Sequence, residues 1–386
     1  MLAKPANAEQ LKDAIGAALA DNRPLEVIGA GSKRGYGRPL QTAGTLDLSA
    51  LSGIVSYEPE ELVVSVRAGT LLAELKAALA ERRQRLAFEP ADWGVLLGSG
   101  ANRATIGGIV AANVAGPRRV SQGAARDHVL GLKCVSGRGE DFVCGGRVVK
   151  NVTGFDLPKL LTGSLGTLAV IHEITLRVAP WPDAACTLAL RDLDDSRAVA
   201  AMTKALSSPY EVSAAAHAGG TTALRLEGPL VSVAARAEAL SHELTAFGPV
   251  ARLDGEQSLR LWRGVRNVTA FATDDRIVWR LMVPPAASAR VVAAIAASHQ
   301  CEAIYDRGGA LVWLALAGPD AAPDFVRGVV EGMAGHATLF RAPEAIRAKV
   351  PPFHPEPAAL HQLSARLKAA FDPQRILNPG RMAADI

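Results

Sequence analysis

The sequence is poor in aromatic residues and cysteine and has no dense basic run, and each shortage argues against a class of protein. Phe, Trp and Tyr make up 5% of its 386 residues, and the net charge is only +4, so we expect no nucleic acid partner. Cys134, Cys144, Cys186 and Cys301 show no CxxC spacing, which argues against a zinc ribbon or an iron–sulfur cluster. We expect reduced core thiols, with Cys134 and Cys144 facing each other across a hairpin as the alternative.

A membrane span and an export signal are also missing from the pattern. Thr105–Gly116 is apolar and rich in small residues, but it has only about a dozen uncharged residues against the ~20 needed to span a bilayer. The first residues, MLAKPANAEQLKDAIGAAL, contain neither a continuous apolar core nor a cleavage site. The sequence therefore predicts no spanning helix and no exported form.

Length and periodicity predict an α+β protein of more than one domain. A chain of this length exceeds one ordinary core. Residues 1–182 combine glycine clusters with short strands, and Pro180 and Pro182 mark the boundary. Residues 183–342 carry two rough rounds of strand, helix, strand, strand, helix, strand, which predict an antiparallel sheet with helices on one face. We expect residues 343–386 to return to the first domain.

Individual elements are readable from capping and apolar spacing. Asn7 with Gln10 predicts a helix start, and LEVIG predicts a strand before the first glycine loop. A helix is predicted to begin near Thr70, with a buried stripe of Leu71, Leu72, Leu75 and Leu79. VLGLKCV and FVCGGRVV around SGRGED predict a β-hairpin. In LWRGVRNVTAF, Trp262, Arg263 and Arg266 predict either an active-site mouth or subunit contact, or a helix face anchored by one tryptophan.

Three glycine clusters stand beside these strands: GAGSKRG at 29–35, ATIGGIVAANVAG at 104–116 and TGSLGTL at 162–168. Glycine permits the close backbone approach and the positive φ angles that amides need to surround a pyrophosphate. Any one cluster alone is equally well explained by a packed turn. Three together predict loops that converge on one large anionic ligand, for which flavin adenine dinucleotide (FAD) is our candidate.

A nicotinamide-binding fold is the alternative for GAGSKRG. That fold requires the third glycine to open a helix directly. Here the loop continues as YGRPLQTAGTLDLS, where Pro39 opposes a helix, and Asp47 lies in what reads as a strand entering a turn rather than at a ribose-binding position. This alternative is therefore disfavoured.

Six segments of the sequence carry a family resemblance. In chain order they are PLEVIGAGSKRG, FEPAD, ATIGGIVAANVAGPRR, RDHVLGLKCVSGRGE, VVKNVTGFDLPKLLTGSLGTLAVIHEITLRV and NPGR. They resemble the FAD-binding PCMH-type flavoproteins of the vanillyl-alcohol oxidase family. VVKNVTGFDLPKLLTGSLG in particular resembles the GlcE-type subunits of bacterial glycolate oxidase. The resemblance spans residues 1–180 and returns at the C-terminus, so it implies a two-subdomain FAD-binding domain followed by a cap domain.

The resemblance implies a set of cofactor-binding residues. The pyrophosphate would lie on the first loop, the ribityl chain and isoalloxazine along the second, and the adenine beside the third. The implied residues are Ala30, Gly31, Ser32, Lys33, Gly35, Pro90, Thr105, Ile106, Gly107, Gly108, Asn113, Gly166, Leu168, Val170 and Arg381. Arg381 stands where such proteins usually have a lysine after NPG, and it would present positive charge to the flavin edge.

Departures from the family pattern qualify the expected chemistry. GAGSKRG contains neither histidine nor cysteine, so the FAD is expected to be noncovalent. GlcD-type relatives carry a histidine and acidic motif in the cap domain, and this sequence has no such cluster, so no metal site is predicted. Of its eight histidines, the loop-borne His354 in PPFHPEP is the candidate for a base, and Arg381 is the other weak catalytic candidate.

The resemblance implies an FAD-binding subunit of a multi-subunit glycolate (2-hydroxy-acid) oxidase or dehydrogenase. Its partners would be a GlcD-like flavin subunit and a GlcF-like iron–sulfur subunit, in the cytoplasm or at the inner face of the cytoplasmic membrane. Two alternatives remain open. One is a self-sufficient FAD-dependent dehydrogenase of another small alcohol or hydroxy acid, with Arg263, Arg266 or His354 in its pocket. The other is a flavin-free scaffold subunit.

Overall fold

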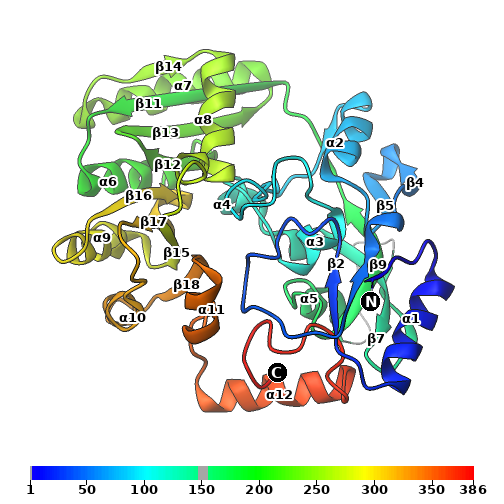
Figure 1. The fold of residues 1–386 in the computed structure, drawn as a ribbon. Coiled ribbons are helices and arrows are strands. Elements are labelled where there is room, and N and C mark those ends of the chain that lie inside the picture. Colours follow the sequence, from blue (N-terminus) through cyan, green and yellow to red (C-terminus); the bar gives the residue numbers. More distant parts are fainter. Residues whose placement is uncertain (1, 147–154) are drawn as a thin grey trace. The chain divides into compact units, whose positions relative to one another are not determined.

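The computed structural model describes residues 2–146 and 155–386, so the motif residues Lys150–Gly154 lie outside the described part. Backbone contacts divide the chain into two units (Figure 1). The first unit consists of Met1–Val114, Ala124–Pro180 and Arg347–Ile386. The second consists of Ala115–Gly123 and Trp181–Ile346. The chain enters and leaves the second unit twice, and the short segment Ala115–Gly123 begins within the last residues of the second glycine cluster.

The first unit contains most of the elements that the glycine clusters join. In chain order they are β1 (Leu2–Ala3), α1 (Ala8–Ala20), β2 (Leu25–Ile28), β3 (Gly44–Asp47), β4 (Ile54–Glu58), β5 (Val63–Arg67), α2 (Leu72–Glu81), β6 (Gln84–Arg85), α3 (Ile106–Ala111), β7 (Val129–Ser136), β8 (Asp141–Gly145), α5 (Leu157–Leu161), β9 (Ala169–Arg177), β10 (Ala179–Pro180) and α12 (Ala358–Phe371). α11 (Glu344–Lys349) crosses from the second unit into the first.

Local chemistry accounts for where these elements begin. The Asn7 side chain accepts a hydrogen bond from Gln10 N at 2.9 Å, so α1 starts where the capping pattern predicts. Leu11 and Ile15 are fully buried, which confirms the apolar face of this helix. The run around Asp47 is also confirmed as a strand entering a turn, because β3 ends at Asp47 and the Asp47 side chain caps the short 3-10 helix that follows.

Among the described residues, the strands of the first unit form three sheets. They are a small parallel sheet, β1-β3-β2, a two-stranded antiparallel sheet, β10-β6, and a five-stranded antiparallel sheet, β4-β5-β9-β7-β8. The predicted hairpin is β7 paired with β8, with Lys133 opposite Val143. One apolar cluster joins α1 and the parallel sheet to Val135 and Val170 of the larger sheet, and Leu377 near the C-terminus belongs to it. The sheets thus hold the first and third glycine clusters around a shared core.

The C-terminal segment is bound to the first unit by a buried charge pair. The Lys368 amine donates to Asp372 Oδ2 at 2.6 Å, to Thr167 O at 2.7 Å and to Leu377 O at 2.8 Å. The Asp372 carboxylate also accepts from the backbone N–H groups of Ile376 and Leu377. Both side chains are almost fully buried, and desolvation lowers the pKa of Lys368. This pair carries hydrogen bonds that fix the chain immediately before the NPGR motif.

The second unit contains two successive rounds of strand, helix, strand, strand, helix, strand, as the sequence predicts. The first round is β11 (Ala184–Arg191), α6 (Asp195–Leu206), β12 (Val212–Ala218), β13 (Thr221–Gly228), α7 (Leu230–Leu244) and β14 (Ala251–Leu253). The second round is β15 (Ile277–Met282), α9 (Ser288–Ala296), β16 (Cys301–Asp306), β17 (Leu311–Leu316), α10 (Pro323–Glu331) and β18 (His336–Arg341). α4 (Arg119–Gln122) and α8 (Gly255–Asn267) complete the described helices of this unit.

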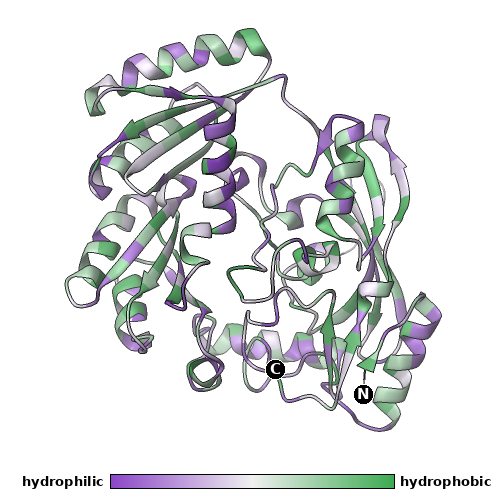
Figure 2. Ribbon diagram, turned by 45° about the horizontal axis from the view of Figure 1, so that its top comes forward, coloured by the Kyte–Doolittle hydropathy of each residue, from purple (hydrophilic) through white to green (hydrophobic). Residues whose placement is uncertain are grey.

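Both rounds share one eight-stranded sheet of the described residues, ordered β14-β11-β13-β12-β16-β17-β15-β18. The order of the second half is the reverse of the first, and the halves meet where His217 of β12 pairs with Tyr305 of β16. Tyr305 donates to Asp195 of α6 at 2.7 Å, which places this helix on the same face as the Tyr305 side chain. Figure 2 shows the strands mostly in hydrophobic colours, whereas the helices alternate between hydrophobic and hydrophilic residues.

Helix α8 packs on the opposite face of that sheet. Trp262 is 3% exposed and donates from Nε1 to Thr187 Oγ1 at 2.9 Å, and the Arg225 guanidinium lies 4.6 Å from the centre of its ring. The reading of this segment as a helix face anchored by one tryptophan is therefore confirmed. Arg263 on the same helix is exposed.

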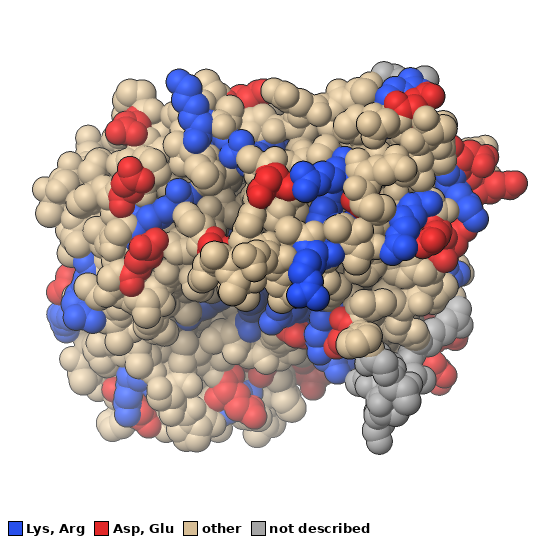
Figure 3. Space-filling model, turned by 90° about the horizontal axis from the view of Figure 1, so that it is seen from below, with Lys and Arg blue, Asp and Glu red and all other residues tan. Residues whose placement is uncertain are grey.

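Charges of both signs are mixed on the one face that Figure 3 shows, where basic side chains stand beside acidic ones. Across the described residues, no helix combines the length and the apolar character that crossing a bilayer requires.

We predict that Lys368→Met lowers the free energy of unfolding by about 3–5 kcal/mol, because it leaves the Asp372 carboxylate buried without its cation. The measurement is the urea midpoint with the slope of the transition. Lys204→Met is the matched control, since its ion pair with Glu243 is solvent-exposed and its removal is expected to leave the midpoint unchanged. Equal midpoints for both variants would contradict a structural role for the buried pair.

Candidate functional site

The three glycine clusters meet around two adjoining cavities of the first unit. The first cavity, of about 80 Å³, is lined by Gly29–Arg34 of the loop after β2, by Thr105 and Gly108 at the start of α3, and by Leu165, Asn378 and Arg381. The second, of about 60 Å³, shares Gly29, Thr105, Gly108 and Leu165 and adds Gly166. Segments more than fifty residues apart in the sequence thus line the same hollow, as three loops converging on one ligand require.

Gly29 is the point at which two of these clusters touch. A Cβ atom at Gly29 would lie 2.2 Å from Thr105 Oγ1, which no side chain tolerates. Thr105 precedes α3, and its hydroxyl accepts from Gly108 N at 3.3 Å. The missing side chain at position 29 therefore lets the backbone of the first loop lie directly on the start of α3, which exposes amides of both segments to one cavity.

Gly166 makes the corresponding approach for the third cluster. Its φ of +70° lies in the left-handed region, and a Cβ there would lie 3.0 Å from Asn378 Nδ2. Asn378 in turn accepts from Val27 N at 2.8 Å and donates to Leu165 O at 2.8 Å. The Asn378 side chain thus joins strand β2 to the third cluster.

Lys33 is one of three basic side chains, with Arg34 and Arg381, that line the first cavity. Its Nζ has a long 3.4 Å contact with Ser32 Oγ, and a Cβ added to Gly108 would lie 3.6 Å from it. Desolvation lowers the pKa of Lys33 from 10.5 to about 8, against the raising effect of Asp92. An amine in this environment gains charge when an anion binds beside it. The residue therefore fits a phosphate-binding role.

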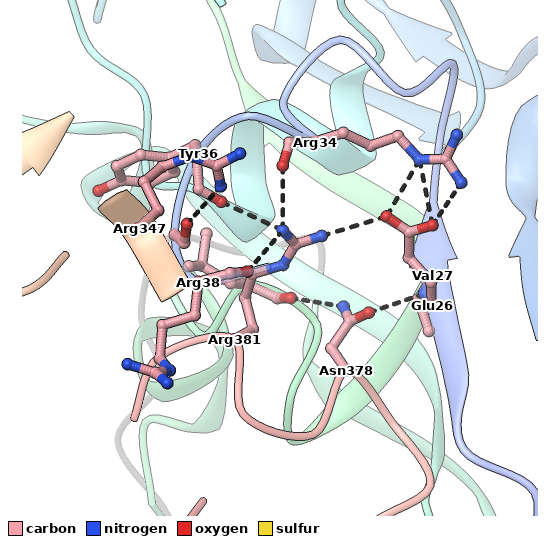
Figure 4. Close-up of polar contacts among 10 residues, drawn as sticks. Glu26, Val27, Arg34, Tyr36, Arg38, Arg347, Asn378 and Arg381 are labelled. Atoms are coloured by element: carbon pink, nitrogen blue, oxygen red, sulfur yellow. Dashed lines mark hydrogen bonds and ion pairs between the residues drawn. The ribbon is translucent and has the colours of Figure 1, made fainter. Parts of the chain in front are cut away.

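Arg381 holds the first loop in shape (Figure 4). Its Nη1 donates to the carbonyl oxygens of Arg34, Tyr36 and Arg38 at 3.1–3.3 Å, and its Nη2 lies 3.4 Å from Glu26 Oε1. Burial lowers the pKa of Arg381 to about 10, with Glu26 opposing the shift. The sequence predicts positive charge toward the flavin edge. The structure shows donors committed to the loop backbone, while the side chain also lines the first cavity.

The predicted cofactor residues fall into four groups. The first cavity is lined by Ala30, Gly31, Ser32, Lys33, Thr105, Gly108 and Arg381. The second is lined by Thr105, Gly107, Gly108, Gly166 and Val170. A third, larger cavity of the first unit is lined by Asn113, Leu168 and His354. Gly35, Pro90 and Ile106 line none of these three cavities of the described residues, and Ile106 is instead a core residue at 1% exposure.

The third cavity, of about 660 Å³, is largely apolar. Leu160, Phe353, Leu367 and Met382 lie in its wall, and its ionisable side chains are Arg38, His354, Glu356 and His361. His361 is paired with Asp385 at 2.8 Å. His354 is thus brought to a cavity that Asn113 and Leu168 also line, and its role as a base stays a prediction.

Sequence reasoning missed Asn378, Leu165 and the helix α3. Asn378 stands in the NPGR motif, of which the prediction used only the arginine. An asparagine directly before Pro-Gly was the sequence signal that could have identified it. Helix α3 was hidden because Gly107 and Gly108 are weak helix formers. Gly107 is required there, since a Cβ would lie 2.7 Å from the Cβ of Ala68. Among the described residues, no group of three or more His, Cys, Asp or Glu side chains is placed to bind a metal.

Comparison with known proteins agrees with this geometry. Residues 1–145 match the family described as "FAD binding domain". The chain is 34% identical over 379 residues to the glycolate oxidase subunit GlcE of Escherichia coli (strain K12), covering 98% of each protein. It is 33% identical over 173 residues to a D-lactate dehydrogenase of Anaerostipes hadrus, covering 44% of this chain and 34% of that protein.

A solved structure of alkyldihydroxyacetonephosphate synthase matches with a TM-score of 0.71 at 14% identity, over 98% of this chain and 75% of that one. That similarity shows the fold, which confirms the predicted α+β architecture of a PCMH-type flavoprotein. The cofactor of this chain is FAD. The narrow approach at Gly29 and the desolvated Lys33 amine fit the pyrophosphate of that group.

We predict that Gly29→Ala raises the dissociation constant for FAD at least about tenfold, because the new methyl group pushes the first loop off Thr105. FAD fluorescence titration measures the effect. Gly16→Ala is the control, since a Cβ at Gly16 meets nothing within 4 Å. Adding Thr105→Ala to Gly29→Ala removes the closest clash and is expected to restore part of the affinity. Wild-type affinity in Gly29→Ala would sink the assignment.

We also predict that FAD affinity falls as pH rises above about 8. The free protein holds the pKa of Lys33 at about 8, and a bound phosphate raises it, so binding takes up a proton above that pH. The dissociation constant should therefore increase by up to about tenfold per pH unit between pH 8 and the pKa of the bound form. Lys33→Met should bind more weakly and lose this dependence, whereas the exposed-site variant Lys12→Met should retain it. A wild-type constant that is flat from pH 7 to 10 would contradict the assignment.

Proposed function

The chain belongs to the family of the glycolate oxidase subunit GlcE, and from this premise we propose that it is the FAD-binding subunit of a multi-subunit oxidase or dehydrogenase of glycolate or a similar 2-hydroxy acid. It is an FAD-linked oxidoreductase. The observation that carries the proposal is the meeting of three glycine-rich segments around the two adjoining cavities with Lys33. The GlcE relative matches this chain over 98% of both lengths, so the premise extends beyond the flavin domain.

The reaction oxidises the 2-hydroxy acid to the corresponding 2-oxo acid, for example glycolate to glyoxylate. The substrate loses a hydride from the α-carbon and the proton of the hydroxyl group. FAD supplies the two-electron acceptor when it is bound. This chain's residues hold and orient the cofactor. Lys33 balances the phosphate charge, Thr105 and Gly29 set the loop spacing, and Arg381 with Asn378 fixes the loops that form the cavity wall.

We further propose that the electrons leave through an iron–sulfur partner of the GlcF type and that a GlcD-type flavin subunit completes the enzyme. Two facts support an assembly. The full-length relative bears the name of a subunit, and residues 2–146 and 155–386 contain no cluster of ionisable side chains suited to a metal next to the substrate. The 28% identity of about half of this chain to the glycolate oxidase subunit GlcD of Bacillus subtilis (strain 168) fits a pair of related flavin subunits.

The test compares the purified, FAD-loaded chain with the assembly formed by adding the GlcD-type and GlcF-type subunits. We expect the chain alone to retain FAD through gel filtration and to turn over glycolate slowly or not at all with a dye acceptor. The assembly should turn over rapidly, and Gly29→Ala should reduce that rate in proportion to its lost FAD. Gly16→Ala is the control in the same assay.

Rapid glycolate turnover by the chain alone would overturn the proposed dependence on partners. The chain would instead have a scaffold role if two results were found together: the purified chain retains no flavin, and the assembly turns over glycolate equally fast with flavin-free chain.

A further inference from the structure

Arg307 occupies a strained turn between β16 and β17. Its φ is +56°, and Gly308 and Gly309 follow with φ of +69° and +96°. A non-glycine residue rarely adopts this conformation, so surrounding contacts must hold it there. The Arg307 N–H donates to Asp306 Oδ1 at 2.7 Å, and a Cβ on Gly309 would lie 2.7 Å from Ser288 Oγ. The fold therefore fixes the direction in which the Arg307 side chain leaves the turn.

The Arg307 side chain is 6% exposed and incompletely bonded. Its Nη2 donates to Ala115 O at 3.2 Å, near the end of the second glycine cluster. Its Nε and Nη1 have no hydrogen-bond partner within the described part of the chain, and Asp306 Oδ2 lies 3.9 Å from Nε. Buried donors left without acceptors cost free energy, and such groups are uncommon in native proteins. An acceptor from outside the chain would remove this cost.

A second arginine, Arg280, stands on the face of the sheet that points away from α6. Tyr305 points toward α6, so Ile304 and its cross-strand partner Trp313 face the other way. Arg280 of β15 pairs with Trp313, and its guanidinium carbon lies 6.0 Å from the centre of that ring. The Arg280 Nε, like two donors of Arg307, has no hydrogen-bond partner among the described residues.

Positive charge is in excess around Arg307. Burial lowers its pKa to about 9, Asp306 opposes that shift, and the charges of Arg280 and Arg119 add to it. The nearby Arg118 shows the contrasting arrangement, because it makes a two-pronged bond with Glu227 at 2.7 and 2.8 Å. Among the described residues whose charges shift the pKa of Arg307, two are arginines and one, Asp306, is acidic. Counting Arg307 itself, three positive charges thus stand against one negative charge.

We propose that Arg307 and Arg280, assisted by the charge of Arg119, bind the carboxylate of a small hydroxy acid. The planar guanidinium offers parallel N–H donors that match the two oxygens of a carboxylate. A carboxylate supplies the missing acceptors and offsets the excess charge at once. The assignment rests on the proposed function, because the carboxylate placed on these two arginines is the acid group of the proposed substrate.

The experiment is calorimetric titration of the FAD-loaded full-length chain with glycolate, with acetate as a carboxylate lacking the hydroxyl and ethane-1,2-diol as the uncharged analogue. Glycolate and acetate are expected to bind, and the diol is not. Arg307→Met should weaken glycolate binding at least about tenfold, and Arg280→Met should weaken it in the same direction. Arg252→Met, at an exposed arginine of the same sheet, is the control and should bind like wild type.

A folding defect in Arg307→Met would appear as lost FAD and a lowered urea midpoint, and Arg280→Met then decides the question. The site is overturned if glycolate affinity is unchanged both in Arg280→Met and in a correctly folded Arg307 variant, either Arg307→Met or Arg307→Lys. Binding of the diol as tightly as glycolate also overturns it. If the two arginines had a structural role alone, their variants would be less stable, and the protein would not bind glycolate more tightly than the diol.

The two proposals fail separately. If the active assembly oxidises glycolate and neither arginine variant raises its KM, the carboxylate site is wrong while the proposed function stands. If the chain binds glycolate through Arg307 and Arg280 but no assembly oxidises it, the site stands and the proposed function fails.

Discussion

The glycine-rich loop after β2 has no strand or helix ladder of its own, so its backbone groups depend on partners from elsewhere. Some of those partners come from the C-terminal NPGR motif, more than 340 residues away in the sequence. Others are Arg103, which donates to Ala30 O, Ser99, which donates to Ser32 O, and Arg347, which donates to Gly37 O. Arg381 donates hydrogen bonds to three loop carbonyl oxygens, and Asn378 joins β2 to the third glycine cluster. Buried backbone groups must be paired. The open shape of the cavity therefore depends on the C-terminal segment, and the buried Lys368–Asp372 pair fixes where that segment lies.

Much of this fold can be predicted from the sequence because local chemistry and the final structure agree. The Asn7 cap, the Leu72–Leu75–Leu79 stripe and the β7–β8 hairpin follow from capping and periodicity. The two rounds of strand, helix, strand, strand, helix, strand in the second unit are predicted in order for the same reason. The reversed strand order of the second half is not, since the junction at His217 and Tyr305 is a contact between residues nearly ninety positions apart.

The candidate site shows the same division. Glycine clusters indicate that the backbone of a loop passes close to a ligand or to another segment. Three such clusters predict loops that converge, and the structure brings them together around shared cavities. They do not reveal what the loop touches. That Gly29 faces Thr105 and that Gly107 faces Ala68 depends on tertiary packing, and so does the commitment of Arg381 to carbonyl oxygens. Arg307 carries no sequence signal at all, because its burial and its φ of +56° appear only in the folded hairpin.

The two units each contain a basic group that the fold leaves short of acceptors. Lys33 has one long contact in the first unit, and Arg307 has two donors without acceptors among the described residues of the second. Folding alone disfavours such groups, because desolvating a cation costs free energy that packing does not return. Both positions are held by backbone that is itself constrained, the Gly29 contact in one case and the Arg307–Gly309 turn in the other. A cation kept under constraint and without its full set of acceptors is best explained by an anion that arrives later. A flavin dinucleotide brings a pyrophosphate and a hydroxy acid brings a carboxylate, so the chemistry of the proposed reaction accounts for both charges.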